Sequence, residues 1–217
     1  SLTDHCNFRC SYCMPVEEME WMPQSKLMSA QEIVKLAQVF VGLGVKKIRL
    51  TGGEPLARKE FPEILEQLSA LPVELTLTTN GVLIHKHLEA LKKAGVRSIN
   101  VSLDTLQPEK FFKLTRRNQF QQVWDNVQTL LQSGFRVKLN AVALHGMIEE
   151  EVGDFVQLTE KLPIHVRFIE FMPFSGNHWQ SKQVVTAAAL LELIQSRFAV
   201  VKLDDQQHDT AKKYQVP

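Results

Sequence analysis

Cysteine, tyrosine and long apolar runs are the scarcest features of this sequence. The 217 residues include three cysteines and two tyrosines, and 25 basic residues nearly balance 24 acidic ones, which leaves a net charge of +1. No apolar run approaches the roughly 20 residues that a membrane-spanning helix needs. Without such a run or an excess of one charge, we expect neither a membrane nor a nucleic acid as a partner.

The sequence also lacks any signal that would divide it. It has no initiating methionine, no signal-peptide core, no Pro/Ser-rich linker and no low-complexity tract. With 44% hydrophobic residues, its composition and size fit one unit with a substantial apolar core. We therefore expect one continuous α/β unit over residues 1–217, and the missing methionine suggests a trimmed start.

The three cysteines, Cys6, Cys10 and Cys13, fall within eight residues. An odd, clustered set is a poor disulfide framework, so we expect a reducing compartment, the cytoplasm. Structural zinc is one interpretation, but zinc normally takes four ligands, and the adjacent residues His5 and Cys6 point in different directions. The C-x3-C-x2-C spacing lets one short loop wrap three thiolates around a [4Fe-4S] cluster, which leaves the fourth iron open to another ligand.

Apolar periodicity predicts alternating helices and strands. A capping-box pattern at Ser29 and Glu32 predicts a helix over about 29–41. Three times a glycine ends a helical pattern and a short strand follows, which indicates repeating βα modules. Strands are predicted near 46–51, 73–79, 97–103, 136–144 and 165–171, with the tail of a strand at 1–3 and a further helix near 186–197. Successive parallel strands of this kind build a partial barrel or a doubly wound sheet.

The ends of the predicted strands mark the candidate ligand site. In both architectures ligands bind at the C-terminal ends of the strands. We expect four residues at these ends: Gly53, Asn80, Asp104 and Met172.

Two charged residues, Arg49 and Lys138, lie on predicted strands. A charge there is costly unless it faces a partner, and a triphosphate or a carboxylate supplies one. A structural salt bridge is the alternative for both residues, and we favour it for Arg167, which lies close to Glu170. Thr78 also fits an ordinary β-branched strand residue.

Two motifs resemble those of the radical S-adenosylmethionine (SAM) superfamily. The first is the cysteine spacing with an aromatic residue, Tyr12, before the last cysteine, and the second is Gly52-Gly53-Glu54-Pro55 after the next predicted strand. The resemblance implies that Cys6, Cys10 and Cys13 hold a [4Fe-4S] cluster whose open iron takes the amino and carboxylate groups of SAM. It also implies that backbone and carboxylate groups of the glycine motif receive the methionine ammonium.

Longer segments narrow the resemblance to the GTP 3′,8-cyclases of molybdenum cofactor biosynthesis. These segments cover residues 3–15, 47–56, 77–81, 99–104 and 167–172. The resemblance implies an α/β fold, a partial (β/α) TIM-type barrel of about six βα units around a parallel sheet. It assigns SAM to Tyr12, Gly53, Ser102 and Met172, and GTP to Arg49, Thr78 and Lys138.

The implied reaction is the first step of molybdopterin biosynthesis. By resemblance, a 5′-deoxyadenosyl radical removes the ribose 3′ hydrogen of GTP, and attack on guanine C8 gives 3′,8-cyclo-7,8-dihydro-GTP. The protein must position the reactants in a dry cavity. The resemblance also implies an electron donor as a partner, and a homodimer is a further expectation.

The chain departs from these cyclases at both ends. Members of that family carry an N-terminal strand with a GTP-contacting arginine, and a C-terminal region whose three further cysteines hold a second [4Fe-4S] cluster. We therefore expect a chain truncated at both ends and incomplete for turnover. Two alternatives stay open: a radical SAM enzyme acting on another substrate such as a peptide, and a zinc-binding structural or interaction module.

Overall fold

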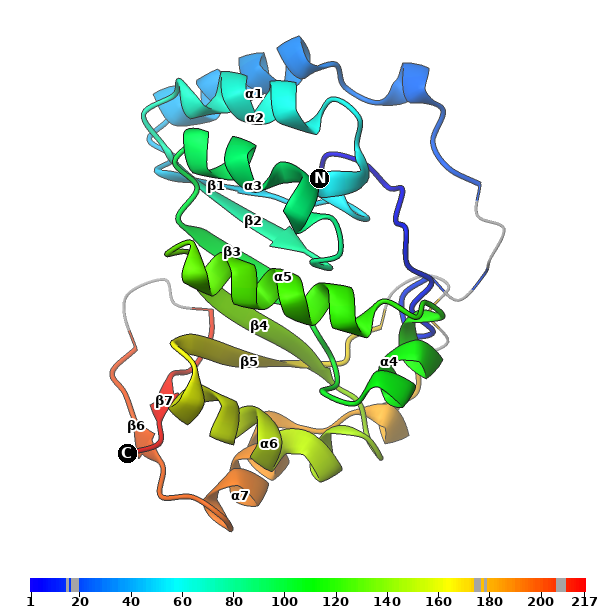
Figure 1. Ribbon diagram of the computed structural model, residues 1–217, viewed down its shortest axis with the longest axis vertical. Helices are drawn as coiled ribbons and strands as arrows, with labels where there is room; N and C mark the ends of the chain where they lie inside the picture. Colours follow the sequence, from blue (N-terminus) through cyan, green and yellow to red (C-terminus); the bar gives the residue numbers. More distant parts are fainter. Residues whose placement is uncertain (15, 17–19, 174–176, 178, 206–209) are drawn as a thin grey trace.

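A parallel five-stranded sheet forms the centre of the molecule (Figure 1). The computed structural model describes residues 1–217 except 15, 17–19, 174–176, 178 and 206–209. The strands follow one another in sequence order and are β1 (Lys47–Leu50), β2 (Glu74–Thr79), β3 (Ser98–Ser102), β4 (Arg136–Ala143) and β5 (Ile164–Glu170). Each pairs in parallel with the next, so helical crossovers must connect them.

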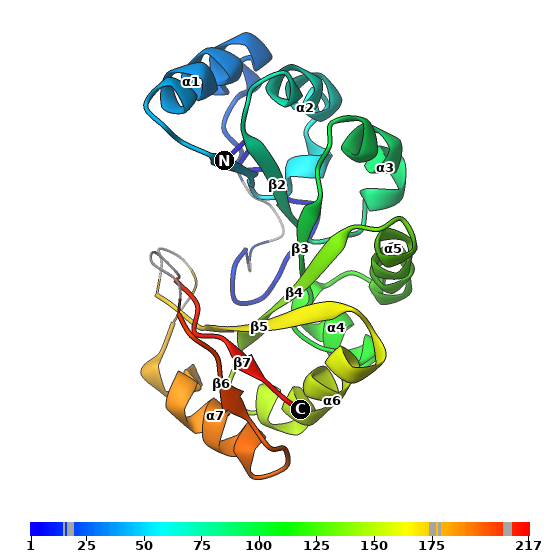
Figure 2. The same ribbon diagram turned by 90° about the vertical axis from the view of Figure 1, so that its left-hand side faces the viewer.

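Seven α-helices accompany the sheet in the described part of the chain. They are α1 (Ala30–Gly42), α2 (Phe61–Ser69), α3 (Ile84–Lys93), α4 (Pro108–Thr115), α5 (Phe120–Gln132), α6 (Ile148–Lys161) and α7 (Ala187–Gln195). Three 3-10 turns are η1 (Gln24–Lys26), η2 (Pro55–Ala57) and η3 (Ser181–Gln183). Figure 2 shows the helices along the convex side of a curved sheet, with the N-terminal segment on the concave side. The α/β partial barrel is therefore confirmed.

Local sequence signals explain where α1 begins. The Ser29 hydroxyl accepts a hydrogen bond from the Glu32 amide at 3.3 Å, and the Glu32 carboxylate accepts one from the Ser29 amide at 2.7 Å. This reciprocal capping box satisfies two amides that a helix start leaves unpaired. The helix predicted over 29–41 is thus confirmed to within one residue.

The strand count is the point where expectation and structure differ. Residues 1–3 lie beside the end of β1, where the Leu2 amide donates to the Thr51 carbonyl at 2.6 Å, yet they form no named strand. After α7, β6 (Val201–Lys202) pairs antiparallel with β7 (Tyr214–Gln215) in a separate ribbon. Five described strands, rather than about six, therefore build the parallel sheet.

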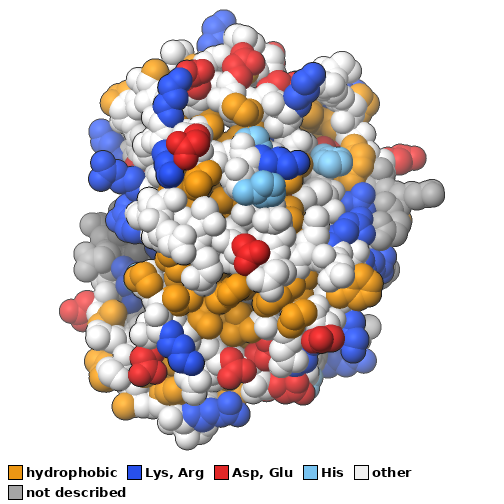
Figure 3. Space-filling model, in the orientation of Figure 1, with side chains coloured by type: hydrophobic (Ala, Val, Ile, Leu, Met, Phe, Trp, Pro, Cys, Tyr) orange, Lys and Arg blue, Asp and Glu red, His pale blue; other side chains and the backbone are white. Residues whose placement is uncertain are grey.

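The apolar core lies between the sheet and its helices. Phe61 and Ile64 of α2 are fully buried, as are Leu77, Ile99 and Leu139 on the facing strands. Because side chains alternate along a strand, their neighbours in each strand face the concave side. The helical surface shows charges of both signs around an apolar band (Figure 3). In the described residues no helix has the length and apolar character that crossing a membrane requires.

Candidate functional site

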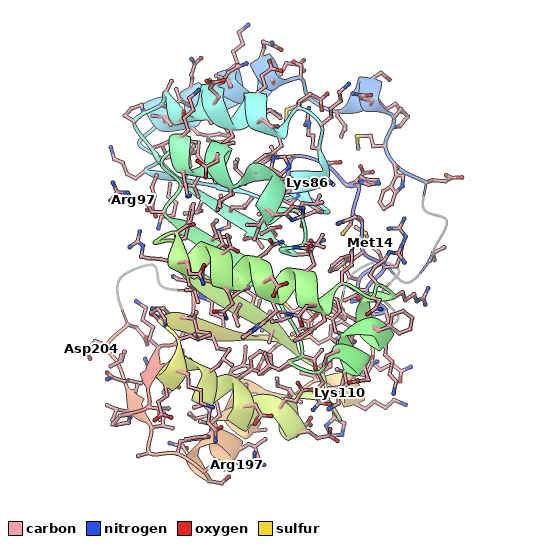
Figure 4. All side chains as sticks on the ribbon, viewed as in Figure 1. Met14, Lys86, Arg97, Lys110, Arg197 and Asp204 are labelled. Atoms are coloured by element: carbon pink, nitrogen blue, oxygen red, sulfur yellow. The ribbon has the colours of Figure 1, made fainter. Side chains whose placement is uncertain are left out.

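The cysteine segment, residues 6–13, is a loop fastened to the C-terminal end of α4. The Arg9 amide donates to the Thr115 carbonyl at 3.0 Å, and the Ser11 amide donates to the Leu114 carbonyl at 2.8 Å. Figure 1 places this loop where the strands end. In Figure 4, Met14, which follows the last cysteine, lies on that side, and Arg97, which precedes β3, lies on the opposite side. The loop therefore occupies the position where parallel α/β folds bind ligands.

The three thiols are free and partly shielded from water. Cys6 and Cys10 are half-buried, and Cys13 is exposed. Burial raises the pKa of each thiol, most strongly at Cys10, and the nearby Asp104 carboxylate adds to the rise at Cys10 and Cys13. Thiols in this environment stay protonated until a positive metal centre displaces the protons. The raised pKa values therefore disfavour a free thiolate nucleophile at these cysteines.

The donor set fits a multi-iron cluster. Among the residues that the structure describes, no three His, Cys, Asp or Glu side chains form a group that could hold one metal ion. His5 instead packs edge-on against Trp21, with the ring centroids 4.9 Å apart. A zinc site of three cysteines and His5 therefore has no support in the geometry. The cysteine spacing offers three thiolates, and a [4Fe-4S] cluster held by three thiolates keeps one iron open.

Gly53 brings the glycine motif against the cysteine loop. Its amide donates to the Thr3 carbonyl at 2.6 Å, and the Glu54 amide donates to the His5 carbonyl at 2.8 Å. A Cβ atom on Gly53 would clash with the carbonyl oxygens of Asp4 and His5. The glycine is therefore needed because the chain's own backbone passes so close, whatever it contributes to a ligand.

The carboxylate of Glu54 turns inward and holds the turn after β2. One oxygen accepts from the Thr79 hydroxyl at 2.8 Å and the Leu56 amide at 3.0 Å, and the other accepts from the Asn80 amide at 2.7 Å. The side chain is fully buried, and burial raises its pKa. Both oxygens of this carboxylate therefore have partners within the chain. The contact of the motif's backbone and carboxylate groups with the methionine ammonium stays a prediction.

Two of the expected SAM residues meet at one small cavity. Tyr12 and Ser102 line a space of about 30 Å³ that Cys10 and Asp104 also border. The Tyr12 hydroxyl donates to the Asp104 carboxylate at 2.6 Å. Met172, 63% exposed, lies beyond the end of β5. The structure thus places Tyr12 and Ser102 at the same cavity, whereas the Met172 side chain is largely exposed to solvent.

Polar side chains around the loop complete its support, and motif spacing alone did not assign them. The Asn80 side-chain amide donates to the Asn7 side-chain oxygen at 2.7 Å and approaches the Cys6 sulfur at 3.9 Å. The Arg117 guanidinium donates to the Asn7 carbonyl at 3.1 Å. Asn80 is expected near the site because it ends a predicted strand and lies in the segment 77–81, whereas the sequence assigns no site role to Arg117.

The expected GTP residues lie together on the concave face. Arg49 lies 3.5 Å from the Thr78 hydroxyl oxygen, and Asn100 stands in register between Thr78 and Lys138. Burial lowers the pKa of Lys138, and the surrounding cations lower it further. We call this group the inner cation cluster; its members are Lys47, Arg49, Arg136, Lys138 and Arg167.

The sequence analysis did not assign a ligand to three members of the inner cation cluster: Lys47, Arg136 and Arg167. The expected pairing of Arg167 with Glu170 conflicts with strand geometry, because residues three apart in a strand face opposite sides. Glu170 instead accepts a hydrogen bond from the Ala187 amide at 2.7 Å. Arg167 faces the cation side, where it lowers the pKa values of Lys138 and His165.

A buried acceptor on the same face lacks a donor. The side-chain oxygen of Asn140 is buried and meets no hydrogen-bond partner among the described residues. Asn140 stands in register between Ser102 and Arg167. A buried oxygen without a donor costs about 1–3 kcal/mol, so a bound ligand with a hydroxyl or amino group would relieve that cost. Together with the thiols, this acceptor indicates that the residues present fit a cluster and a polar ligand.

Comparison with known proteins identifies the class. Residues 1–159 match the Radical SAM superfamily, and the chain belongs to it. A [4Fe-4S] cluster and SAM are the characteristic cofactors of that superfamily. The fold agrees, because SuiB of Streptococcus suis, solved bound to SAM, superposes with a TM-score of 0.73 at 21% identity over 89% of this chain and 44% of that one.

Sequence relatives identify the narrower family. The chain is 41% identical, over all of its length and 69% of the relative, to GTP 3′,8-cyclase of Desulforamulus reducens, and it belongs to the GTP 3′,8-cyclase family. It is 47% identical, over all of its length, to mitochondrial GTP 3′,8-cyclase of Arabidopsis thaliana, of which it spans 56%. The chain thus spans about half to two thirds of these relatives.

Proposed function

We propose that this chain is the core of a radical SAM GTP 3′,8-cyclase, which converts GTP to 3′,8-cyclo-7,8-dihydro-GTP in the first step of molybdopterin biosynthesis. One observation carries the proposal. The thiols lie at the strand ends, and the inner cation cluster lies on the concave face of the same sheet. This arrangement supports a site that binds a metal cluster at one end and a polyanion at the other.

The residues at the strand ends would hold the cofactors. Cys6, Cys10 and Cys13 supply three thiolates, and Tyr12 and Ser102 border the adjacent cavity. When bound, the reduced cluster and SAM supply an electron and a carbon radical that removes a hydrogen atom. The protein itself positions the ligands and keeps water away, because burial already shields two of the thiols.

The inner cation cluster would hold the triphosphate of GTP. Arg49 and Lys138, with Thr78 between them in space, offer charge-assisted hydrogen bonds to phosphate oxygens. Burial lowers the pKa of Lys138, and repulsion from the neighbouring cations lowers it further. A bound triphosphate would remove that repulsion, so the geometry favours a polyanionic substrate over a neutral peptide.

The remaining partners and the location are part of the same proposal. We infer that residues 1–217 form one radical SAM core domain, which receives its electron from a separate donor and acts as a homodimer. The longer relatives leave room for further segments, including a region for a second cluster. Three free cysteines support a reducing compartment, and we propose the cytoplasm.

Anaerobic reconstitution tests the proposal. We expect brown protein with about four irons per chain and a spectrum that changes when SAM is added. With dithionite, SAM and GTP, mass spectrometry should detect 5′-deoxyadenosine and, if this chain suffices for turnover, the cyclised nucleotide. Colourless protein with stoichiometric zinc would contradict the radical SAM assignment. If the rate of 5′-deoxyadenosine formation did not change when GTP was added, and if the chain did not bind GTP, the substrate would be another molecule.

A further inference from the structure

A carboxylate without a cation lies beside the cysteine loop. Asp104, two residues beyond β3, accepts from the Tyr12 hydroxyl at 2.6 Å and from the Val142 amide at 2.9 Å. Both donors are neutral, and no described lysine or arginine forms an ion pair with Asp104. Two hydrogen bonds therefore fix the position of a half-buried carboxyl group. Burial raises its pKa, and no described cation neutralises it when it is ionised.

This carboxylate lies close to the thiols. Asp104 and Cys10 line the same cavity of about 30 Å³. The Tyr12 hydroxyl, which donates to Asp104 at 2.6 Å, belongs to the residue directly before Cys13. An ionised carboxylate at this position disfavours further negative charge beside it.

A second buried carboxylate nearby shows what is different about Asp104. Glu151 accepts from the Thr105 hydroxyl at 2.8 Å and from the Leu106 amide at 2.7 Å, and it also pairs with Lys110 at 3.1 Å. It braces the turn that begins right after Asp104, but its charge has a cationic partner, and it is not among the causes that shift the thiol pKa values. Glu151, which lies on α6 and contacts the turn after Asp104, thus offers a matched control.

We propose that Asp104 is a positioning residue that lowers the reduction potential of the cluster held by Cys6, Cys10 and Cys13. This inference rests on the proposed function, because it requires a cluster on these thiols. Reduction adds one electron from a low-potential donor to the cluster and makes or breaks no bond. A fixed negative charge nearby makes that electron harder to add, and local charge is a recognised lever on iron–sulfur potentials.

Asp104→Asn removes the negative charge of the side chain and keeps its shape. The amide oxygen can accept from the Val142 amide, while the amide nitrogen donates to the Tyr12 hydroxyl oxygen, so both hydrogen bonds persist. Tyr12→Phe does the reverse, because it removes one hydrogen bond and keeps the carboxylate. Together with Glu151→Gln, these variants separate the electrostatic effect from a loss of local structure.

The test is a redox titration of the reconstituted chain, with dithionite as reductant and the reduced cluster followed by electron paramagnetic resonance. We expect Asp104→Asn to favour reduction about tenfold, which is a rise of about 59 mV for one electron. Glu151→Gln should match the wild type, and Tyr12→Phe should show no rise. An unchanged potential in Asp104→Asn with a full cluster would overturn the inference.

Two further outcomes are also decisive. If Asp104→Asn alone fails to bind iron while Glu151→Gln and Tyr12→Phe succeed, the carboxylate serves cluster assembly, and the inference is wrong. If the wild-type chain itself binds no cluster, the proposed function fails, which is a different result from a wild-type cluster whose potential is insensitive to Asp104.

Discussion

The cysteine end of the concave face and the inner cation cluster have opposite electrostatic character. At the cysteine end, burial and the carboxylate of Asp104 raise the pKa values of thiols. On the sheet, burial and neighbouring cations lower the pKa of Lys138. A metal cluster would bring positive charge to the first region, and a polyanion would bring negative charge to the second. The contrast indicates one elongated site with two chemically distinct ends.

The two regions are also built differently. The three cysteines lie within one short segment, and backbone hydrogen bonds from Arg9 and Ser11 to the end of α4 hold that segment in place. The inner cation cluster depends on strand register, which aligns residues far apart in the sequence. Substitutions in the cysteine loop should therefore abolish binding of the metal cluster, whereas substitutions in the inner cation cluster should change the affinity for an anion by degrees.

The largest effect should follow the loss of one thiolate. Cys10→Ala leaves two thiolates for a cluster that needs three, so we expect almost all bound iron to be lost. Iron and sulfide analysis after anaerobic reconstitution measures this. Ser11→Ala, in the same loop, is the matched control and should keep its iron. If Cys10→Ala retained about four irons per chain, the assignment of the cluster to the cysteine loop would be wrong.

Gly53→Val should also disturb the cysteine end. The added Cβ would clash with the carbonyl oxygens of Asp4 and His5, so the loop must shift. Overpacking of this kind costs about 1–3 kcal/mol, and each kcal/mol lowers Tm by about 2–4 °C in a domain of this size. We expect a lower Tm together with reduced iron content.

Gly42→Ala is the control for that prediction, because an added Cβ there meets nothing within 4 Å. It should leave iron content unchanged, and its helical position favours alanine by up to about 1 kcal/mol. If Gly53→Val kept its cluster and its Tm but lost SAM binding, the glycine would serve the ligand alone.

Motif spacing and local capping predicted the cysteine end and much of the fold. Ser29 and Glu32 lie close in sequence, and their capping box needs no tertiary information, so α1 was predicted to within one residue. The cysteine spacing likewise lies within one loop. Among its supports from distant segments, Asn80 and Asp104 were expected at the strand ends, whereas Arg117 was not assigned to the site.

The inner cation cluster could only be predicted in part, because it depends on register and on which face each residue occupies. Arg49 and Lys138 were assigned by resemblance, whereas Lys47 and Arg136 join them only once β1 and β4 are placed in the sheet. The inward turn of Glu54 was missed for a related reason. Two of its hydrogen-bond partners, Thr79 and Asn80, lie at the end of β2, and a motif does not reveal them.

Lys138→Gln should weaken GTP binding about tenfold or more, because a hydrogen bond to a charged group contributes about 1.5–3 kcal/mol. The lysine pKa is lowered, so its charge, and with it GTP affinity, should fall as the pH rises through that lowered pKa. Calorimetric titration at several pH values measures both effects. The variant should lose this pH dependence, whereas Lys86→Gln, on the exposed face of α3, should keep it.

The lowered pKa of Lys138 should also make folding stability depend on pH, and in the direction opposite to GTP affinity. A depressed pKa means that the unfolded chain binds the proton more readily than the folded chain. The contribution of Lys138 to stability should therefore rise with pH between its folded and unfolded pKa values. Bound GTP should reduce that rise, since a neighbouring anion favours the charged lysine. Equal pH profiles with and without GTP would place the nucleotide elsewhere.

The smallest effect should come from the carboxylate at the edge of the inner cation cluster. Glu74 lies 3.0 Å from the Lys47 ammonium and 3.9 Å from the Arg136 guanidinium, and all three side chains are substantially exposed. Glu74→Gln removes a negative charge that competes with a bound anion. We expect GTP affinity to rise about two- to threefold at low salt, because exposed ion pairs contribute little and salt screens them.

The gain in Glu74→Gln should disappear at high salt, where the Debye length falls below the distance over which these charges interact. Glu89→Gln is the matched control, since Glu89 pairs with Lys92 on α3 at 3.0 Å, away from the sheet. Its GTP affinity should equal that of the wild type. Weaker GTP binding in Glu74→Gln would mean that the carboxylate orders Lys47 and Arg136 for the phosphate instead of competing with it. The inner cation cluster would then be a preorganised site rather than a set of mutually repelling charges that awaits an anion.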